Sequence, residues 1–370
     1  GVRVAEQSAG RFGAPGDSPE DLEQRAFEAL REPTRDPFGD SWLEPFAAIE
    51  TLGDWRRARD GNRGASGERS VAACGMSWWK RDEIRRFLWS PGPPLRIARS
   101  DRHAVEEAAK QGGSLAVWPS RVSSELNEVA AARGVKLVRV EDGFVRSVGL
   151  GSNLVPPLSI IVDRQGIHYD PSQPSDLETL LATTQFSSAT LKRAERLRAA
   201  IVEAGISKYA SGEGTGTKSI ELSALERRFV LVPGQVEDDM SVLAGGGGLT
   251  SNLELLRRVR ALEPEADIWW RPHPDVDAGH RKGAVADDEA LRYADRIVRE
   301  GAMSDLLSQA DSLHTITSLS GFEALMRDCE VTCHGVPFYS GWGLTRDLGD
   351  VPSRRGRRLS LAELLAGVLV

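Results

Sequence analysis

Two adjacent carboxylates at the end of a predicted strand are the first candidates for chemistry in this sequence. Residues 135–140 form a short run rich in β-branched side chains, which is typical of a buried strand. Glu141 and Asp142 follow at once, and Gly143 then allows close approach to the backbone. Arg146 and Ser147 add a cation and a hydroxyl. Ligands of open α/β sheets bind beyond the carboxyl ends of strands, so this cluster predicts a polar ligand site. An ordinary Asp-Gly turn is the alternative.

Cationic and hydroxyl groups that could bind phosphate follow two later predicted strands. Residues 268–270 predict a strand that leads into Arg271 and His273, the latter between two prolines that hold it stiffly. A lone histidine is usually structural, but the neighbouring arginine favours a phosphate-binding pair. Residues 311–316 predict the next strand, and residues 317–323 bring hydroxyls and backbone N–H groups to a helix start. That arrangement suits phosphate or ribose, whereas a plain serine N-cap is the alternative.

A third group follows the first predicted strand, at residues 71–77. Two tryptophans, Lys80 and Arg81 open the helix that comes next. Aromatic and cationic side chains at such a position could bind sugar or phosphate, although the tryptophans could equally be packing. The glycine-rich residues 211–219 resemble a P-loop but depart from it, because Thr217 stands in place of glycine and no strand precedes them. We interpret this segment as a flexible linker.

The elements that must position these groups alternate between short strands and helices. Such alternation predicts parallel sheets with helices on both faces, and 370 residues are too many for one core. We therefore expect an N-terminal helical extension over residues 1–68 and a first α/β domain over residues 69–210. A second α/β domain over residues 217–345 and a C-terminal helix over residues 346–370 complete the expected division.

Composition excludes several classes of protein. A formal net charge of −7 argues against nucleic-acid binding, which requires neutralisation of phosphates. Three cysteines provide neither a disulfide framework nor a four-ligand metal set, which fits a reducing compartment. No apolar run approaches the length of a membrane-spanning helix, and the first residues lack the core of a signal peptide. Because the chain starts without Met, we expect it to be a fragment of a longer protein.

Six motifs in one order, within residues 70–368, resemble the KpsC-type capsule polysaccharide proteins, which are retaining β-Kdo glycosyltransferases. Kdo is 3-deoxy-D-manno-oct-2-ulosonic acid, an eight-carbon acidic sugar. The motifs are VEDGFVRSVGLG (140–151), HYDPSQPSDL (168–177), VPGQVEDD (232–239), RPHPDV (271–276), SLSGFEAL (318–325) and HGVPFYSGWGLT (334–345). The segment GMSWWKR (75–81) is most similar to the second of the two transferase modules in such proteins.

The resemblance implies a GT-B architecture, in which two Rossmann-like domains face each other across a cleft. It implies CMP-β-Kdo as the donor and a product that keeps the β configuration. The second domain would bind the nucleotide, and we assign this role to His273, Pro274, Arg271, Ser318, Ser320, Gly321, Glu323 and Gln235. The first domain would supply the catalytic carboxylate and the acceptor surface. We assign Arg146, Ser147, Lys80 and Arg81 of the first domain, and Trp342 of the second, to the sugar or acceptor.

The resemblance places the reactive carboxylate in the Glu-Asp-Gly motif, and we assign Asp142 as the nucleophile of a double displacement. Successive strand residues point to opposite faces, so only one of the two carboxylates is expected to face the cleft. Glu141 would then orient Asp142 or pair with Arg146. Asp275 and Asp277 lie beyond the His-Pro turn, so no obligatory metal is expected. No cofactor is expected besides the donor substrate.

The expected partners are CMP-Kdo, a Kdo-terminated glycolipid acceptor that forms a poly-Kdo lipid linker, and a preceding transferase module. The expected location is the cytoplasm, with peripheral contact at the inner face of the inner membrane. Two alternatives stay open: another GT-B transferase that uses a different CMP- or UDP-sugar, and a non-catalytic carbohydrate-binding module. A Rossmann dehydrogenase is opposed by the sequence, because residues 149–154 lack the final glycine of the dinucleotide-binding pattern.

Overall fold

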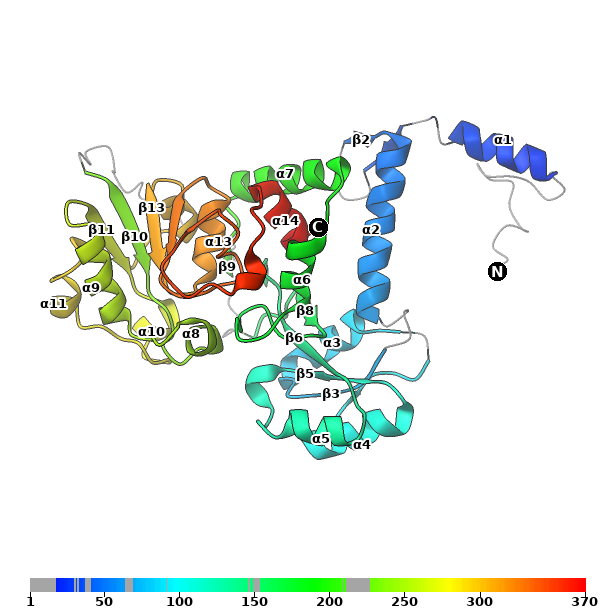
Figure 1. Cartoon of the computed structure of the whole chain (residues 1–370), viewed down its shortest axis with the longest axis horizontal. Coiled ribbons are helices and arrows are strands. Elements are labelled where there is room, and N and C mark those ends of the chain that lie inside the picture. The colour runs from blue at the N-terminus through cyan, green and yellow to red at the C-terminus, as the bar shows by residue number, and fades with distance from the viewer. Residues whose placement is uncertain are drawn as a thin grey trace.

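The computed structural model shows an α/β protein (Figure 1) and describes residues 18–29, 31, 33–36, 41–63, 69–90, 92–145, 147–148, 154–207, 209–210 and 227–370. Two larger sheets organise the described residues, one of five strands and one of six. Their strands are short and mostly buried, as expected where helices cover both faces of a sheet. Expectations that concern residues 1–17, 146, 149–153 and 211–226 lie outside the described residues.

The first sheet has the strand order β4-β3-β5-β6-β8. Four strands are parallel, and the edge strand β8 runs antiparallel to β6. The strands are β3 (Ser70–Cys74), β4 (Arg96–Ile97), β5 (Ser114–Val117), β6 (Leu137–Asp142) and β8 (Ile160–Asp163). The connecting helices are η1 (Trp78–Lys80), α3 (Arg81–Phe87), α4 (Asp101–Gln111), η2 (Pro119–Arg121) and α5 (Leu126–Ala132). Every residue of β3 and β5 is buried, which makes them the centre of this sheet.

The second sheet is parallel throughout and has the order β12-β11-β10-β13-β14-β15. Its first strand along the chain, β10, lies in the interior, and the order reverses between β10 and β13, as in doubly wound nucleotide-binding folds. The strands are β10 (Phe229–Pro233), β11 (Asp267–Arg271), β12 (Arg296–Ile297), β13 (Ser312–Thr315), β14 (Glu330–Cys333) and β15 (Arg346–Asp347). The helices are α8 (Met240–Gly245), α9 (Asn252–Leu262), α10 (Pro274–Asp277), α11 (Asp287–Ala290), α12 (Met303–Leu307) and α13 (Leu319–Leu325).

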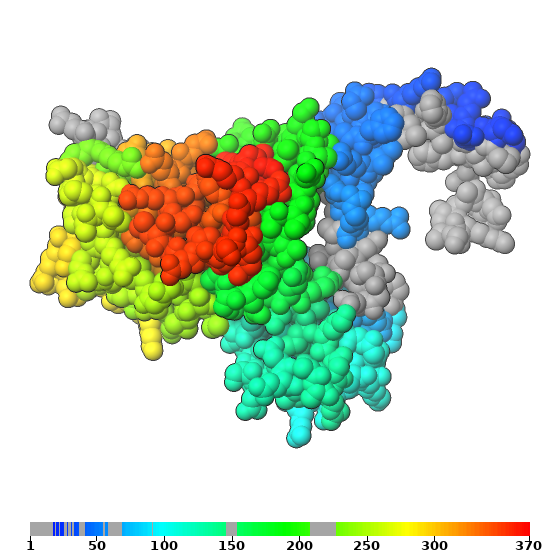
Figure 2. All heavy atoms as spheres, viewed as in Figure 1, coloured from blue at the N-terminus to red at the C-terminus, as the bar shows by residue number. Residues whose placement is uncertain are grey.

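Three further helices, α6 (Asp176–Thr183), α7 (Ser188–Glu203) and α14 (Leu361–Leu369), pack together beside the second sheet (Figure 1). Leu181 of α6 and Ile201 of α7 belong to the same hydrophobic cluster as Leu231 of β10. The space-filling view shows the red C-terminal segment lying directly against the green segment that contains α6 and α7 (Figure 2). The expected division near residues 210–217 therefore does not coincide with the division of the cores, because α6 and α7 come before those residues in the chain yet pack against the second sheet.

The N-terminal part forms α1 (Pro19–Ala29), a hairpin of β1 (Thr34–Arg35) and β2 (Trp42–Leu43), and α2 (Pro45–Arg63). Helix α2 packs against α7 (Figure 1). It is tied to α7 by the hydroxyl of Thr190, which donates to a carboxylate oxygen of Asp54 over 3.1 Å. A small parallel pair, β7 (Ser147–Val148) with β9 (Tyr209–Ala210), completes the strands. No helix within the described ranges is long and apolar enough to cross a membrane.

Candidate active site

A cavity of about 280 Å³ lies between the carboxyl edges of the two sheets. From the first sheet, Trp118 follows β5, and Glu141 and Asp142 end β6. From the second sheet, Thr317 follows β13 and Phe338 follows β14. The remaining lining residues are Ser120, Gly143, Phe144, His168, Tyr169, Asp239, Met240, Ser241, Leu319 and Pro337. The cavity thus occupies the position at which α/β sheets bind their ligands.

Asp142 is held in this cavity by a buried lysine. The Nζ atom of Lys80 donates to both carboxylate oxygens of Asp142, over 2.8 and 2.9 Å. Lys80 is only 6% exposed, and its ammonium lies 3.7 Å from the ring centroid of Trp118 and 5.0 Å from that of Trp79. Charge-assisted bonds of this kind fix the direction of a carboxylate. The structure therefore places Lys80 against the carboxylate rather than on an exposed acceptor surface.

Glu141 contacts Asp142 through the backbone. One carboxylate oxygen of Glu141 accepts a hydrogen bond from the Asp142 N–H over 3.1 Å. Both residues line the cavity, and the expectation that the side chain of only one of them faces it stays a prediction. Asp239, which caps α8 by accepting from the Ser241 N–H over 3.0 Å, adds a third carboxylate from the other side.

Gln235 shapes the turn that follows β13. Its side-chain oxygen accepts from the Thr315 hydroxyl over 3.0 Å and from the N–H groups of Ile316 and Thr317 over 3.1 and 3.0 Å. Its amide nitrogen donates to the Thr317 hydroxyl over 3.1 Å. Gln235 is 6% exposed, so it fixes the backbone that leads to Ser318 from within. Gln235 therefore supports the turn through hydrogen bonds, although it does not line the cavity itself.

The predicted nucleotide residues lie around this turn and around the neighbouring His-Pro turn. Ser318 accepts from the Ser320 N–H over 3.2 Å and caps α13. Gly321 is required there, because a Cβ atom would stand 2.2 Å from the Tyr339 hydroxyl oxygen. Glu323 is buried in α13. Thr317 and Leu319, on either side of Ser318, line the cavity. The turn therefore brings backbone and hydroxyl groups to the wall of the cavity that faces Asp142.

His273 and Arg271 have different surroundings. The Nδ1 atom of His273 accepts from the Asp275 N–H over 3.2 Å, which caps α10 next to Pro274 and places the hydrogen of the neutral ring on Nε2. The guanidinium of Arg271 donates to the backbone oxygens of Val298 over 3.3 Å and of Gly301 over 2.8 Å. Its burial lowers the pKa of Arg271. Arg271 therefore braces the chain after β12.

Two of the residues assigned to the sugar or acceptor, Trp342 and Arg81, are not among the residues that line the cavity. Trp342 is fully buried, and its indole nitrogen donates to the Phe338 oxygen over 2.9 Å. The assignment of Trp342 to an acceptor surface is thus wrong, since the ring fills the core behind β14. The guanidinium of Arg81 donates to the Met76 oxygen over 3.4 Å. Arg146 and the side chain of Ser147 lie outside the described residues.

Tyr169 is the clearest site residue that sequence reasoning left out. It lines the cavity, is 9% exposed, and its hydroxyl makes no hydrogen bond to any described residue. Burial, and then the nearby carboxylates of Glu141 and Asp239, raise the pKa of Tyr169 above its usual range. Tyr169 belongs to the motif HYDPSQPSDL (168–177), and this motif is the feature of the sequence that could have identified it. Among the described residues, no three His, Cys, Asp or Glu side chains form a metal-binding group, and the three cysteines are free and buried.

Fold and cavity define an α/β protein with a partly polar cavity at the carboxyl ends of two sheets, the usual place of a ligand site in such proteins. The chain belongs to the capsule polysaccharide biosynthesis protein family, whose model matches residues 114–367. Two KpsC structures from Thermosulfurimonas dismutans are similar. The "beta Kdo 2,7 transferase" is 35% identical with a TM-score of 0.64, and the alignment covers 81% of this chain and 90% of that one. The "beta Kdo 2,4 transferase" is 32% identical with a TM-score of 0.67, and the alignment covers 82% of this chain and 91% of that one.

Curated relatives agree with this family. The capsule polysaccharide modification protein LipA of Neisseria meningitidis serogroup A is 39% identical over 88% of this chain and 45% of its own length. The lipopolysaccharide-processing protein LpsZ of Rhizobium meliloti is 39% identical over 83% of this chain and 70% of its own length. The chain therefore spans less than half of LipA. The KpsC-type resemblance read from the six motifs is confirmed.

Proposed function

We propose that this chain is a retaining β-Kdo glycosyltransferase of GT-B architecture. It would move Kdo from CMP-β-Kdo to a Kdo-containing glycolipid acceptor in capsule polysaccharide biosynthesis. Two observations support the transferred sugar: the similarity to two KpsC structures named as Kdo transferases and the family to which the chain belongs. The single observation that carries the mechanism is Asp142, which ends β6 inside a cavity shared with the second sheet.

In the first displacement, an Asp142 carboxylate oxygen attacks the anomeric carbon of Kdo. An ester bond forms to that carbon, the bond to the phosphate oxygen breaks, and CMP leaves with the electron pair. Its phosphate is a good leaving group, so hydrogen bonds to the departing oxygens replace acid assistance. We assign these bonds to His273 Nε2 and to the turn at residues 317–320. Arg271 is not included, because its described donors serve backbone oxygens.

In the second displacement, an acceptor hydroxyl oxygen attacks the same carbon and the ester bond breaks. The hydroxyl proton passes to a carboxylate of the cavity, Glu141 or Asp239. Two inversions at one carbon give net retention. Because protein groups alone contact the leaving phosphate in this scheme, transfer is expected to persist in excess EDTA. Loss of transfer that Mg²⁺ or Mn²⁺ restores would redirect attention to Asp275 and Asp277.

The covalent ester is the decisive test of this proposal. Enzyme incubated with CMP-β-Kdo and no acceptor should gain the mass of one Kdo residue, located on the peptide that holds Asp142. Asp142→Ala should show no adduct and no transfer. Asp82→Ala removes a carboxylate whose side chain is 76% exposed on α3, and it should behave like the unmodified protein. An adduct on Glu141, or transfer by Asp142→Ala near the normal rate, would contradict the assignment.

Donor screening separates the alternatives. Hydrolysis of CMP-β-Kdo, CMP-sialic acid and UDP-hexoses should be compared at equal concentrations, with CMP-β-Kdo expected to react fastest. A preference for a UDP-sugar would indicate another GT-B transferase. Binding of a Kdo-terminated acceptor with no turnover of any nucleotide sugar would indicate a carbohydrate-binding module. Linkage analysis of the product from a synthetic Kdo acceptor would then identify the hydroxyl that accepts the sugar.

A further inference from the structure

The environment of Lys80 bears on which sugars can form the ester with Asp142. Lys80 reaches the Asp142 carboxylate from η1, and its Nζ atom lies nearly equidistant from the two Asp142 oxygens, at 2.8 and 2.9 Å. The lysine is 6% exposed, and the Trp118 ring lies 3.7 Å from its ammonium. Whichever oxygen of Asp142 attacks, the newly bonded carbon is therefore placed close to a buried positive charge.

The first displacement of the proposed function changes the charge at this place. Before attack, the carboxylate of Asp142 neutralises the ammonium of Lys80. After attack, Asp142 is a neutral ester, so the charge that faced Lys80 has gone. Removing the opposite charge from a buried ion is strongly unfavourable. A neutral sugar transferred to Asp142 brings no negative charge to replace the one that is lost, whereas a sugar that carries its own carboxylate at the reacting carbon does.

We propose that Lys80 selects donors of the 2-ulosonic acid class by binding the carboxylate attached to the anomeric carbon. This inference rests on the proposed function. In the ester, the carbon of that carboxylate is two bonds from the Asp142 oxygen, about 2.4 Å away at ordinary bond lengths. Its oxygens thus come within reach of Lys80 Nζ as the bond to the phosphate breaks. No proton moves, and Lys80 exchanges one carboxylate partner for another.

This exchange makes Lys80 a specificity-determining residue. Aldoses carry a hydrogen at the anomeric carbon, so they cannot supply the replacement charge. The effect would appear in the chemical step, because the sugar carboxylate gains its partner only as Asp142 loses its negative charge. Interactions that strengthen toward the transition state raise the rate and not merely the affinity.

The test compares CMP-β-Kdo with its methyl ester at the anomeric carboxylate, in the unmodified protein and in Lys80→Met. The rate of adduct formation without acceptor is followed by mass spectrometry. The unmodified protein should prefer the free acid by about 100-fold, the usual effect of losing one partner of a buried charge pair. In Lys80→Met this preference should fall below about fivefold. Lys110→Met, an exposed lysine on α4, is the matched control and should keep the full preference.

The outcomes separate this inference from the proposed function. Failure of the unmodified protein to react with CMP-β-Kdo contradicts the proposed function itself. If the protein reacts but does not distinguish acid from ester, the role of Lys80 is overturned, whether or not the variant folds. If Lys80→Met slows both donors by one common factor, Lys80 only positions Asp142, and the inference again fails. CMP affinity, measured by calorimetry, should be unchanged in Lys80→Met, which shows that the variant is folded.

Discussion

Asp142 occupies a position prepared by residues from distant parts of the chain. Lys80 and Trp118 follow two different strands, yet the ammonium of Lys80 contacts both the Asp142 carboxylate and the Trp118 ring. Parallel strands end at one edge of a sheet, so groups that follow β3, β5 and β6 converge there. Such contacts hold a reactive group in one geometry before the substrate arrives. The order of strands in the sheet, and not proximity in sequence, therefore builds this site.

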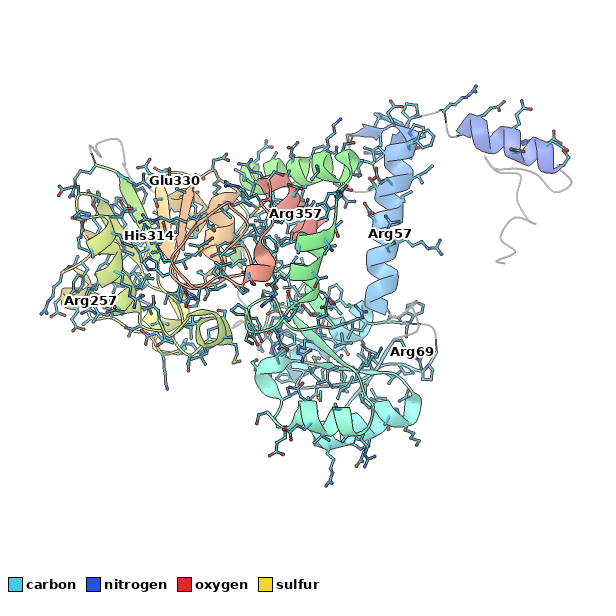
Figure 3. All side chains as sticks on the ribbon, in the orientation of Figure 1. Arg57, Arg69, Arg257, His314, Glu330 and Arg357 are labelled. Carbon is cyan, nitrogen blue, oxygen red and sulfur yellow. The ribbon has the colours of Figure 1, made fainter. Side chains whose placement is uncertain are left out.

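A second group of titratable residues lies away from the cavity, in the second sheet. His314 Nδ1 and His334 Nε2 are 3.2 Å apart, and both side chains are buried; His314 lies among the strands of this sheet in Figure 3. Burial first, and nearby positive charge second, lower the pKa of His314 to about 3 and that of His334 to about 4. Both rings are thus neutral in the folded protein near pH 7.

These two pKa values predict acid sensitivity of the fold. Unfolded histidine titrates near pH 6.5, so below that pH the unfolded chain binds protons that the folded protein does not. Stability is full above about pH 6.5 and falls as the pH drops toward the folded values, by up to about 1.4 kcal/mol per pH unit for each histidine. Urea unfolding at pH 7, 6 and 5 measures this slope. His314→Gln should reduce it, and His280→Gln, at an exposed position, should not.

At the scale of elements, the turn after β13 depends on a side chain from the neighbouring strand end. Gln235 satisfies the backbone N–H groups of Ile316 and Thr317. Unpaired buried donors cost about 1–3 kcal/mol each. Gln235→Leu should therefore destabilise the protein by a few kcal/mol and weaken CMP binding, as measured by urea unfolding and calorimetry. Gln309→Leu, an exposed glutamine in this half of the chain, is the control. Unchanged CMP affinity in Gln235→Leu would separate the turn from the nucleotide.

Local signals predicted many of these elements. The sequence predicts a helix over residues 252–262 and a helix capped by Ser175, and the chain forms α9 (Asn252–Leu262) and an α6 that Ser175 caps. The sequence also predicts a hairpin in which residues 158–163 and 167–169 flank a turn at residues 164–166, and this prediction is wrong. Residues 160–163 form β8, which pairs with β6, and residues 167–169 form no strand. The Asp163 carboxylate accepts from the N–H groups of Gly166 and Asp176, so the chain turns toward α6 instead of returning.

The site was predictable only where one segment carries it. The sequence predicts a strand over residues 136–140 that leads into two carboxylates, and β6 (Leu137–Asp142) confirms this strand; the role of the carboxylates stays a prediction. Tyr169 and Asp239 were not assigned, because each joins the cavity through tertiary packing. Trp342 was misplaced for the same reason. An aromatic side chain in a glycine-rich motif can face a ligand or fill the core, and only the packing around it decides which.

At the scale of the whole molecule, a buried ion pair ties residues 176–183 to the C-terminal segment. Arg355 donates to Glu178 over 2.6 Å, and both side chains are buried. Arg355 also donates to the Pro337 oxygen over 2.6 Å, which links this pair to the segment that lines the cavity. Sequence patterns do not reveal such pairing, because its partners lie 177 positions apart.

Removing one partner of this pair should be costly. Glu178→Ala leaves the buried guanidinium of Arg355 without this carboxylate, and such changes destabilise proteins by about 3–5 kcal/mol. The loss should appear as a lower urea midpoint. Glu195→Ala, an exposed glutamate on α7, is the matched control and should change stability little. A loss for Glu178→Ala no larger than that of the control would show that the ion pair does not hold α6 in place.

We expect the two sheets to have separate roles: the second sheet binds the nucleotide, and the first sheet supplies the nucleophile. If His273 and the turn at residues 317–320 hold CMP, CMP should raise the melting temperature of the protein by mass action. His273→Ala should remove most of that shift while leaving the melting temperature without ligand unchanged. Asp142→Ala should keep the shift, because its carboxylate belongs to the first sheet, and yet lose transfer.

The pair of variants makes this division testable in one assay. His280→Ala changes an exposed histidine seven residues after His273, and it controls for the loss of an imidazole. A normal CMP shift in His273→Ala would remove His273 from the nucleotide site. Loss of the shift in Asp142→Ala, with its unliganded melting temperature unchanged, would instead mean that CMP reaches across the cavity to the first sheet. In that case donor binding and nucleophile would share one wall, and the separation of roles between the sheets would fail.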